Sequence, residues 1–316
     1  MKILFIVDPL DSLKIYKDST YTMMAEAATR GHELYVMRQE ELLWKRGKVM
    51  GITRQITLRN HATPWYRLDP MLEMPLSGFD AVLMRKDPPF DMEYVTSTWL
   101  LEQAQREGAR VFNDPRAVRD HNEKFAIAQF PQFTVPTVVT RSANQLQAFI
   151  DEHQDVILKP LDGMGGSQIF RARANDPNRN VIVETLLHEG MRNVMAQRYI
   201  PEIVNGDKRV LLIAGKPVPY CLARIPKEGE TRGNLAAGGR GEARELTAHD
   251  RKIAEALGPE LMRRGLLLVG LDVIGENLTE INVTSPTCFR EIMDQTGCNV
   301  AGLMLDALEA ACGKKA

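Results

Sequence analysis

Apolar segments alternate with helical patterns over about the first 120 residues of the chain. Runs rich in aliphatic and β-branched residues predict strands at residues 2–7, 33–37, 79–85 and 110–113. Two stretches with helical periodicity, each followed by a glycine, predict helices over residues 18–30 and 93–107. A hairpin-like segment surrounds residues 46–48. Strands that alternate with helices predict an α/β unit built on a parallel sheet.

Two loops of this predicted sheet carry polar residues at the carboxyl ends of strands, where ligands of open α/β sheets bind. One loop begins at Asp8, and the other is the Arg-Lys-Asp-Pro-Pro sequence at residues 85–89. Arg85 is a candidate for binding a substrate carboxylate. The alternative is that Arg85 pairs with Asp87 or Asp91 and fixes a loop stiffened by proline.

The middle of the chain contains a glycine-rich turn, residues 163–167, between two predicted strands. The predicted elements of this region are a helix at 123–130, a strand at 134–140, a helix at 142–153, and strands at 155–159 and 168–173. No helix follows the glycines, so the turn differs from a P-loop and from a dinucleotide-binding fingerprint. It fits a hairpin that covers phosphates, with Lys159 as a point charge; an ordinary β-hairpin is the alternative.

A later segment predicts further parts of a nucleotide site. Residues 193–200 predict an edge strand that ends at Pro201 and offers backbone groups and apolar cover to an adenine ring. Residues 206–213 predict a strand, and a hairpin returns to Arg224. The stretch 226–242 is dense in glycine and charge, which predicts a long loop that acts as a lid or is disordered. Arg232 and Asn234 would suit a lid that closes on anionic groups.

Residues 270–287 predict a hairpin with three oxygen donors. Strands at 271–274 and 278–283 flank the Gly-Glu-Asn sequence that forms the turn. Asp272 and Glu280 can then converge across the strand pair, with Asn282 on the same face as Glu280. Two carboxylates and an amide oxygen form the ligand type that Mg²⁺ prefers. The alternative is an exposed hairpin whose acids face water.

Composition narrows the class of protein. The chain has 316 residues, 44% of them apolar and 26% charged, which predicts two or three packed units of a soluble globular protein. A net charge of -1 gives no overall bias toward nucleic acid or membrane. We expect a cytoplasmic protein, because the sequence shows neither a membrane span nor a signal-peptide core. The four cysteines form no CxxC pair, so reduced thiols are expected.

Taken together, these motifs resemble the ATP-grasp ligases. Those that carry the resemblance are Lys124, Lys159-Pro160, the turn 163–167, Asp207 with Arg209, the loop 232–239 and the trio Asp272, Glu280 and Asn282. More narrowly, MRKDPPFD, ILKPLDGMGG, ARIP followed by ETRGNLAAGGRGE, and TEINVTSPT resemble bacterial glutathione synthetases. The resemblance implies an α/β chain, α+β in its C-terminal part. A Rossmann-like N-terminal domain (1–121) precedes a two-lobed ATP-grasp fold, with a lid subdomain (122–200) and a catalytic subdomain (201–316).

The resemblance also implies a reaction and its residues. It implies ATP-dependent ligation of γ-glutamylcysteine and glycine through an acyl phosphate, with release of ADP and phosphate. The implied nucleotide-binding residues are Lys124, Lys159, Gly163, Met164, Gly165, Gly166, Gln197, Tyr199, Ile200 and Asp207. Arg209 is the implied catalytic residue, which steadies the phosphoryl group and the later oxyanion. Glu280 is expected to bridge two Mg²⁺ ions, with Asp272 on one and Asn282 on the other; Mn²⁺ is the alternative metal.

The remaining expectations concern substrates, partners and competing functions. The candidate substrate contacts are Arg85, Arg224, Arg232, Asn234, Ser285 and Thr287. Ser285 and Thr287 would meet the glycine carboxylate, unless they only form a turn around Pro286. We expect a homo-oligomer, a dimer or tetramer, with no nucleic-acid or membrane partner. Other carboxylate-amine ligases, of the D-alanine-D-alanine or protein-terminus type, and a non-catalytic ATP-binding regulator are the alternative functions.

Overall fold

The first part of the protein is built on a mixed sheet of order β3-β4-β2-β1-β7-β8, with β5 and β6 also paired to β4. The structure is a computed structural model that describes residues 1–316 except 60–61, 164, 234, 236–237 and 314–316. The strands are β1 (Lys2–Ile6), β2 (Glu33–Met37), β3 (Leu42–Lys45), β4 (Lys48–Leu58), β5 (Tyr66–Leu68), β6 (Leu72–Pro75), β7 (Ala81–Met84) and β8 (Val111–Phe112). The run β2-β1-β7-β8 is parallel, as predicted. The antiparallel strands β3 to β6 extend it, of which the sequence indicated only the hairpin at 46–48.

Helices cover both faces of this sheet because β1 is apolar on both sides. They are α1 (Ser19–Thr29), α2 (Met92–Arg106) and α3 (Pro115–Arg119), with short 3-10 turns at η1 (Leu10–Ser12), η2 (Gln39–Glu41) and η3 (Leu76–Gly78). Successive residues of a strand face opposite sides. Leu4 and Ile6 therefore pack in the cluster that contains residues of α2, whereas Ile3 and Phe5 pack with α1. The Asp18 carboxylate accepts the Tyr21 N–H at 2.7 Å and caps the start of α1.

The second part is a lobe with a four-stranded antiparallel sheet of order β11-β10-β12-β9. Its elements are β9 (Thr137–Thr140), α4 (Ala143–His153), β10 (Asp155–Pro160), β11 (Phe170–Arg173), α5 (Arg179–Leu187) and β12 (Val194–Arg198). The prediction of an edge strand at 193–200 was wrong, because β12 lies between β10 and β9 and pairs with both. Helix α5 was not predicted.

The predicted helix at 123–130 was also wrong. The segment forms only the 3-10 turn η4 (Phe125–Gln129), followed by η5 (Pro131–Phe133). Glu123 instead bonds to the end of a distant strand: its carbonyl accepts the Ile281 N–H at 2.8 Å, and its carboxylate accepts the N–H groups of Val283 and Thr284. The first of these tertiary hydrogen bonds uses the Glu123 carbonyl, which a continuous helix would direct along its own axis.

The third part is a five-stranded antiparallel sheet of order β15-β14-β13-β16-β17, reached through η6 (Pro201–Asn205). Its elements are β13 (Asp207–Ile213), β14 (Lys216–Ile225), β15 (Arg240–Glu245), α6 (Ala248–Arg263), β16 (Leu268–Ile274), β17 (Asn277–Asn282), α7 (Phe289–Thr296) and α8 (Val300–Ala311). Thr247 and Asp250 form a capping box at the start of α6. The predicted loop 226–242 is shorter than expected because β15 begins at Arg240, and α7 was not predicted.

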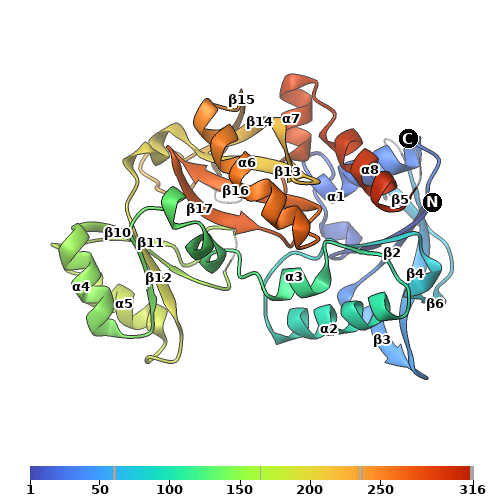
Figure 1. The fold of residues 1–316 in the computed structure, drawn as a ribbon, viewed down its shortest axis with the longest axis horizontal. Helices are drawn as coiled ribbons and strands as arrows, with labels where there is room; N and C mark the ends of the chain where they lie inside the picture. Colours follow the sequence, from blue (N-terminus) through green and yellow to red (C-terminus); the bar gives the residue numbers. More distant parts are fainter. Residues whose placement is uncertain (60–61, 164, 234, 236–237, 314–316) are drawn as a thin grey trace.

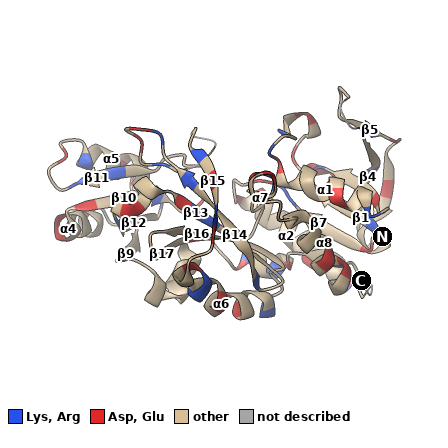
Figure 2. Cartoon of the chain, turned by 90° about the horizontal axis from the view of Figure 1, so that it is seen from above, with Lys and Arg blue, Asp and Glu red and all other residues tan. Residues whose placement is uncertain are grey.

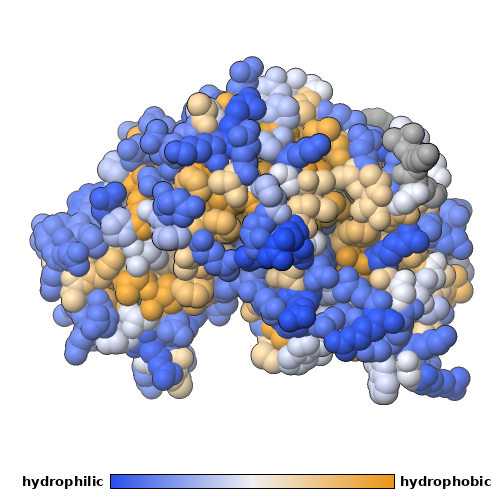
Figure 3. Space-filling view, viewed as in Figure 1, coloured by the Kyte–Doolittle hydropathy of each residue, from blue (hydrophilic) through white to orange (hydrophobic). Residues whose placement is uncertain are grey.

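The three parts are arranged side by side in Figure 1, with the lobe of α4 and α5 at one end and the N-terminal unit at the other. Helices α7 and α8 lie next to α1 and also contact strands of the five-stranded sheet, so they pack between that sheet and the N-terminal unit. Basic and acidic residues are interspersed along the elements in Figure 2. The outline of the molecule is notched between the lobe and the N-terminal unit (Figure 3). No helix among the described residues is long and apolar enough to span a membrane, and all four cysteines are free thiols.

Candidate functional site

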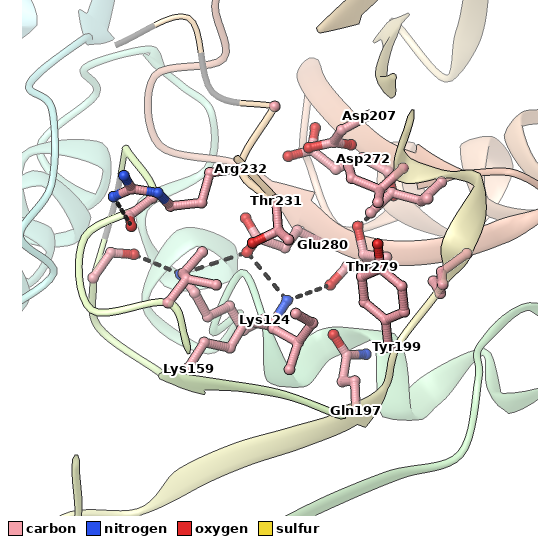
Figure 4. Close-up of a pocket in the computed structure, with 18 of the residues that line it drawn as sticks. Lys124, Lys159, Gln197, Tyr199, Asp207, Thr231, Arg232, Asp272, Thr279 and Glu280 are labelled. Carbon is pink, nitrogen blue, oxygen red and sulfur yellow. Dashed lines mark hydrogen bonds and ion pairs between the residues drawn. The ribbon is translucent and has the colours of Figure 1, made fainter. Parts of the chain in front are cut away.

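A cavity with about 840 Å³ of empty volume, including the space at its mouth, lies between the lobe and the five-stranded sheet. We call it the first cavity (Figure 4). The candidate residues that line it are Lys124, Lys159, Gly163, Gly165, Gly166, Gln197, Tyr199, Ile200, Asp207, Arg232, Asp272 and Glu280. The structure therefore brings together residues from four places: the linker between α3 and β9, the four-stranded sheet with its glycine-rich turn, the five-stranded sheet, and the loop after β14. Two further candidates, Met164 and Asn234, lie outside the described residues.

The predicted hairpin forms, and it sets two of the oxygen donors opposite each other. In the β16–β17 pair, Asp272 is in register with Glu280, and Gly270 is in register with Asn282. A bulge follows Asp272. The Asn282 side-chain nitrogen donates to the Gly270 carbonyl at 3.1 Å, which fixes the amide and leaves its oxygen on the opposite side of the group.

Two lysines face Glu280 from different elements. Lys159 of β10 lies 3.3 Å from the Glu280 carboxylate, and Lys124 of the linker lies 3.7 Å from the same oxygen. Both ammonium groups point toward Glu280 in Figure 4. Burial opposes ionisation of Glu280, but the two lysines outweigh it and lower its pKa. Lys124 also donates to the Gly163 carbonyl at 2.5 Å, so one lysine ties the glycine-rich turn to β17.

Two arginines hold Asp272. Arg209 of β13 approaches its carboxylate at 2.6 Å, and Arg224 of β14 approaches it at 2.8 Å. Burial opposes ionisation here too, but both guanidinium groups outweigh it and hold the pKa of Asp272 well below its usual range. Arg224 also pairs with Asp207, whose pKa burial raises. The site thus carries buried positive charge that an anion can share.

One end of the first cavity is apolar and aromatic. The isoleucines of its wall, which the sequence analysis did not identify, are Ile157, Ile169, Ile203 and Ile274. The Arg171 guanidinium stacks on the Tyr199 ring at 3.6 Å and forms a two-point ion pair with Asp155. The Gln197 amide donates to the Thr137 hydroxyl at 3.2 Å. Flat apolar walls of this kind suit a heteroaromatic ring.

The loop after β14 contacts the glycine-rich turn. Arg232 donates to the Gly166 carbonyl at 3.4 Å and pairs with Glu230 at 2.6 Å. Gly233 sits against the chain below it: a Cβ atom there would come within 2.3 Å of the Arg224 carbonyl oxygen. The absence of a side chain at this position therefore lets the loop approach the cavity closely.

A second cavity, with about 1480 Å³ of empty volume, lies between the N-terminal unit and the five-stranded sheet. The predicted residues on its wall are Gly165, Arg209, Arg224, Asn282, Ser285 and Thr287. Asp8 and Asp87 also line it, and they come from the two loops that the sequence predicted at the ligand edge of the sheet. Charged residues that the sequence analysis did not propose for the site line it as well: Lys14, Lys17, Asp18, Glu123 and Glu291. The Ser285 hydroxyl donates to Asp87, and Thr287 is exposed.

The donor chemistry of the hairpin fits a divalent cation. Asp272, Glu280 and Asn282 offer only oxygen ligands, which suits Mg²⁺. Among the residues that the structure describes, no group of three or more His, Cys, Asp and Glu side chains could hold a metal ion. With two carboxylates and one amide, a metal here would need further oxygen ligands from a bound phosphate or water.

Comparison with known proteins gives consistent results over the whole chain. The family model of the prokaryotic glutathione synthetase N-terminal domain matches residues 1–119, and that of the prokaryotic glutathione synthetase ATP-grasp domain matches residues 123–297. A glutathione synthetase of Nitrosomonas europaea is 62% identical, with 100% of this chain and 99% of the relative covered. A glutathione synthetase of Pseudomonas aeruginosa is 54% identical, with 96% of each covered.

Solved structures of other ligases share the fold at low sequence identity. A D-cycloserine synthetase aligns with a TM-score of 0.69 and 17% identity, over 98% of this chain and 99% of the other. D-alanyl-alanine synthetase A from Vibrio cholerae aligns with a TM-score of 0.61 and 12% identity, over 99% and 98%. These similarities concern the arrangement of the chain.

Proposed function

The chain belongs to the prokaryotic glutathione synthetase family, and we infer from this that it joins γ-glutamylcysteine to glycine with conversion of ATP to ADP and phosphate. It is an ATP-dependent carboxylate-amine ligase with an ATP-grasp domain. The alternative ligases and the non-catalytic regulator are not favoured, because the sequence relatives named above share more than half of their residues with this chain.

One observation carries the assignment of roles within the site. Asp272 and Glu280 line the first cavity, whereas Asn282 lines the second, so the hairpin stands at the boundary between them. Gly165 of the glycine-rich turn lines both cavities. A nucleotide in the first cavity would thus present its terminal phosphate to a carboxylate in the second.

We assign the first cavity to ATP. Tyr199, Gln197 and Ile200 would contact the adenine end, where the wall is apolar. Lys124 and Lys159 lie beside Glu280 and would neutralise the phosphates, with the backbone of the glycine-rich turn close to the phosphate oxygens. Two Mg²⁺ ions held by Asp272, Glu280 and Asn282, or Mn²⁺ in their place, would supply charge neutralisation between the phosphates and the incoming carboxylate.

Arg209 and Arg224 are placed to stabilise the negative charge that develops in both steps of the ligation. In the first step, a carboxylate oxygen of the dipeptide attacks the γ-phosphorus and ADP leaves, which turns a poor acyl donor into an acyl phosphate. In the second, the glycine amine attacks the acyl carbon, phosphate leaves, and the amine gives up a proton. Arg209 and Arg224 line the second cavity beside Asp272, where they would stabilise the negative charge of both steps.

The loop after β14 would keep water from the acyl phosphate. Arg232 already contacts the glycine-rich turn, and Leu235 lines the second cavity, so the loop reaches both cavities. Water competes with the amine for an activated acyl group, and a closed loop removes that competitor. Ser285 and Thr287 are assigned to the glycine carboxylate because both line the second cavity.

We also propose that the protein is a homo-oligomer, a dimer or tetramer. Trp44 on β3, Leu72 on β6 and Met71 just before β6 expose 59%, 52% and 60% of their surface on the antiparallel extension of the N-terminal sheet. Exposed apolar groups near a sheet edge favour contact with a second copy. Light scattering after size exclusion measures the mass; a monomer at micromolar concentration would contradict the proposal.

Coupled release of ADP tests the reaction. Purified protein with ATP, Mg²⁺, γ-glutamylcysteine and glycine should release ADP and form glutathione in equal amounts. Omission of either substrate should reduce ADP release to background, and D-alanine should not replace the pair. ADP release that is robust with D-alanine but absent with γ-glutamylcysteine and glycine would reject the assignment.

A further inference from the structure

The strand that carries Glu280 and Asn282 lies at the edge of the five-stranded sheet. Among the described strands, β17 pairs only with β16. The linker segment around η4 lies against β17 (Figure 1). An edge strand leaves backbone N–H and C=O groups without partners in its sheet, and such groups need partners when they are buried. Residues from outside the sheet provide these partners.

Glu123 of the linker bonds to backbone groups on both sides of Asn282. Its carbonyl accepts the Ile281 N–H at 2.8 Å. One oxygen of its carboxylate accepts the N–H groups of Val283 and Thr284 at 2.8 and 2.9 Å, and it also accepts the Thr284 hydroxyl at 2.9 Å. All three partner residues are buried. Loss of the Glu123 carboxylate would therefore leave donors without partners in a buried segment, which is costly.

Asn113, which follows β8 of the N-terminal unit, holds the same hairpin at another point. Its side-chain nitrogen donates to the Val283 carbonyl at 2.8 Å and to the Leu268 carbonyl at 2.7 Å, and its oxygen accepts the Leu268 N–H at 2.9 Å. Leu268 begins β16, and Val283 directly follows β17. One buried amide thus ties the two strands of the hairpin together at their open end.

These contacts flank the oxygen donors assigned to the metal. Ile281 lies between Glu280 and Asn282, and Val283 follows Asn282 directly. Side chains two residues apart on a strand lie on the same face, so a shift of the backbone at Ile281 or Val283 would move a donor oxygen with it. Mg²⁺ demands a nearly ideal octahedral set of ligands. A small displacement of this backbone would therefore weaken the binding of the cation.

We propose that Glu123 is a positioning residue for the divalent cation: it fixes the backbone on both sides of Asn282 and so keeps the oxygens of Glu280 and Asn282 in one arrangement. The inference rests on the proposed function, because that function assigns the metal to this hairpin. Lys124, the next residue, lies 3.7 Å from the Glu280 carboxylate, so the same contacts fix a phosphate-binding lysine against β17. Glu123 acts through hydrogen bonds, and an uncharged acceptor of the same shape can replace it.

Binding of Mn²⁺ tests this role without turnover. The full-length protein is titrated with Mn²⁺ in the presence of a non-hydrolysable ATP analogue, and free Mn²⁺ is measured by electron paramagnetic resonance, with the protein-free titration subtracted. Glu123→Ala should raise the dissociation constant about 10-fold or more, because it removes a residue that orients the ligands. Glu123→Gln keeps an acceptor oxygen at the same position and should stay within about threefold of wild type.

Glu107→Ala is the matched control. The Glu107 carboxylate at the end of α2 also accepts a backbone N–H from a distant strand, that of Val49 at 2.8 Å, and Glu107 lines neither cavity. This variant should lose stability but keep the wild-type affinity for Mn²⁺. A dissociation constant does not depend on the fraction of folded protein, so partial unfolding changes only the number of sites.

Two further measurements support the comparison. If Glu123→Ala does not fold, Glu123→Asp replaces it: its shorter side chain cannot reach all three donors, and the dissociation constant should rise by an intermediate factor, about 3-fold to 10-fold. In the ligation assay, the affected variant should need a higher Mg²⁺ concentration for half-maximal ADP release. Its rate at saturating Mg²⁺ should recover most of the loss, because the defect lies in metal affinity.

The outcomes separate the positioning role from the proposed function. If wild type binds Mn²⁺ but does not turn over γ-glutamylcysteine and glycine, the proposed function fails, and the variants still decide the role of Glu123. The positioning role is overturned if wild type binds no Mn²⁺ or if removal of the Glu123 contacts leaves the dissociation constant within about threefold of wild type. It is also overturned if Glu107→Ala has the same effect, or if Glu123→Gln binds as weakly as Glu123→Ala, because lost stability or lost charge would then be the cause.

Discussion

His121 lies at the junction between the N-terminal unit and the rest of the chain, and its burial predicts a specific loss of stability in acid. The side chain is only 3% exposed. Burial, and then the neighbouring Arg264, lower its pKa to about 4, although the Ile281 backbone opposes this shift. The folded protein therefore keeps His121 neutral at a pH where an unfolded chain would bind a proton.

The size of this stability loss follows from the difference between the pKa of His121 in the folded protein and its pKa in the unfolded chain. An unfolded histidine has a pKa of about 6.5, so the stability that depends on the neutral ring is complete above about pH 6.5 and is lost as the pH falls toward about 4. At pH 5 the expected loss is about 2 kcal/mol in the free energy of unfolding, and the full difference approaches about 3 kcal/mol.

Urea unfolding at pH 7.5 and pH 5.0, followed by tryptophan fluorescence, measures this loss. His121→Met replaces the ring with an apolar side chain that does not titrate and adapts its shape. Between the two pH values wild type should lose about 2 kcal/mol more than this variant. His188→Asn is the control: the site is exposed and left-handed, with a φ of 47°, which Asn tolerates, so it should follow wild type. Equal losses in wild type and His121→Met would refute the reasoning.

Three further changes probe the site and the core. Glu280→Gln removes a charge that faces two lysines and is assigned to the metal; kcat should fall by about 100-fold or more, and a variant that loses only ATP affinity would contradict the assigned role. Gly233→Ala forces a Cβ atom to within 2.3 Å of the Arg224 carbonyl oxygen, so kcat/KM should fall about 10-fold or more while the melting temperature changes little. Gly78→Ala is the control: the nearest atom to its Cβ would lie at 3.8 Å, so kcat/KM should stay unchanged. Leu257→Ala empties a fully buried position on α6 and should cost about 2 to 5 kcal/mol in urea unfolding; a loss below about 1 kcal/mol would show that the core closes around the gap.

Local patterns in the sequence were sufficient to predict most elements. The hairpin of β16 and β17 illustrates why: alternation along each strand and a short turn fix which residues face each other, and Asp272 does pair with Glu280. The glycine-rich turn after β10 and the helices α1, α2 and α4 were also predicted from patterns within their own segments. The roles assigned to the site residues stay predictions until substrates are tested.

Contacts between distant segments decided the rest. The hydrogen bonds from Val283 and Thr284 to the Glu123 carboxylate could not be predicted, because these partners are 160 and 161 residues away along the chain. The helical pattern around Glu123 depends only on neighbouring residues. The position of β12 inside its sheet could not be predicted either. The order of strands in a sheet depends on which distant segments pair, and the residue pattern within one strand does not record that order.

The sequence by itself therefore determined which short elements form and which residues share a strand face, because these depend on neighbours along the chain. Only the tertiary structure decided that Lys124 and Lys159 meet at Glu280, that two arginines hold Asp272, and that Arg85 is buried against Pro286. Burial and charge pairing are properties of the packed chain. They set the pKa values and the buried, ligand-ready charges that give this site its chemistry.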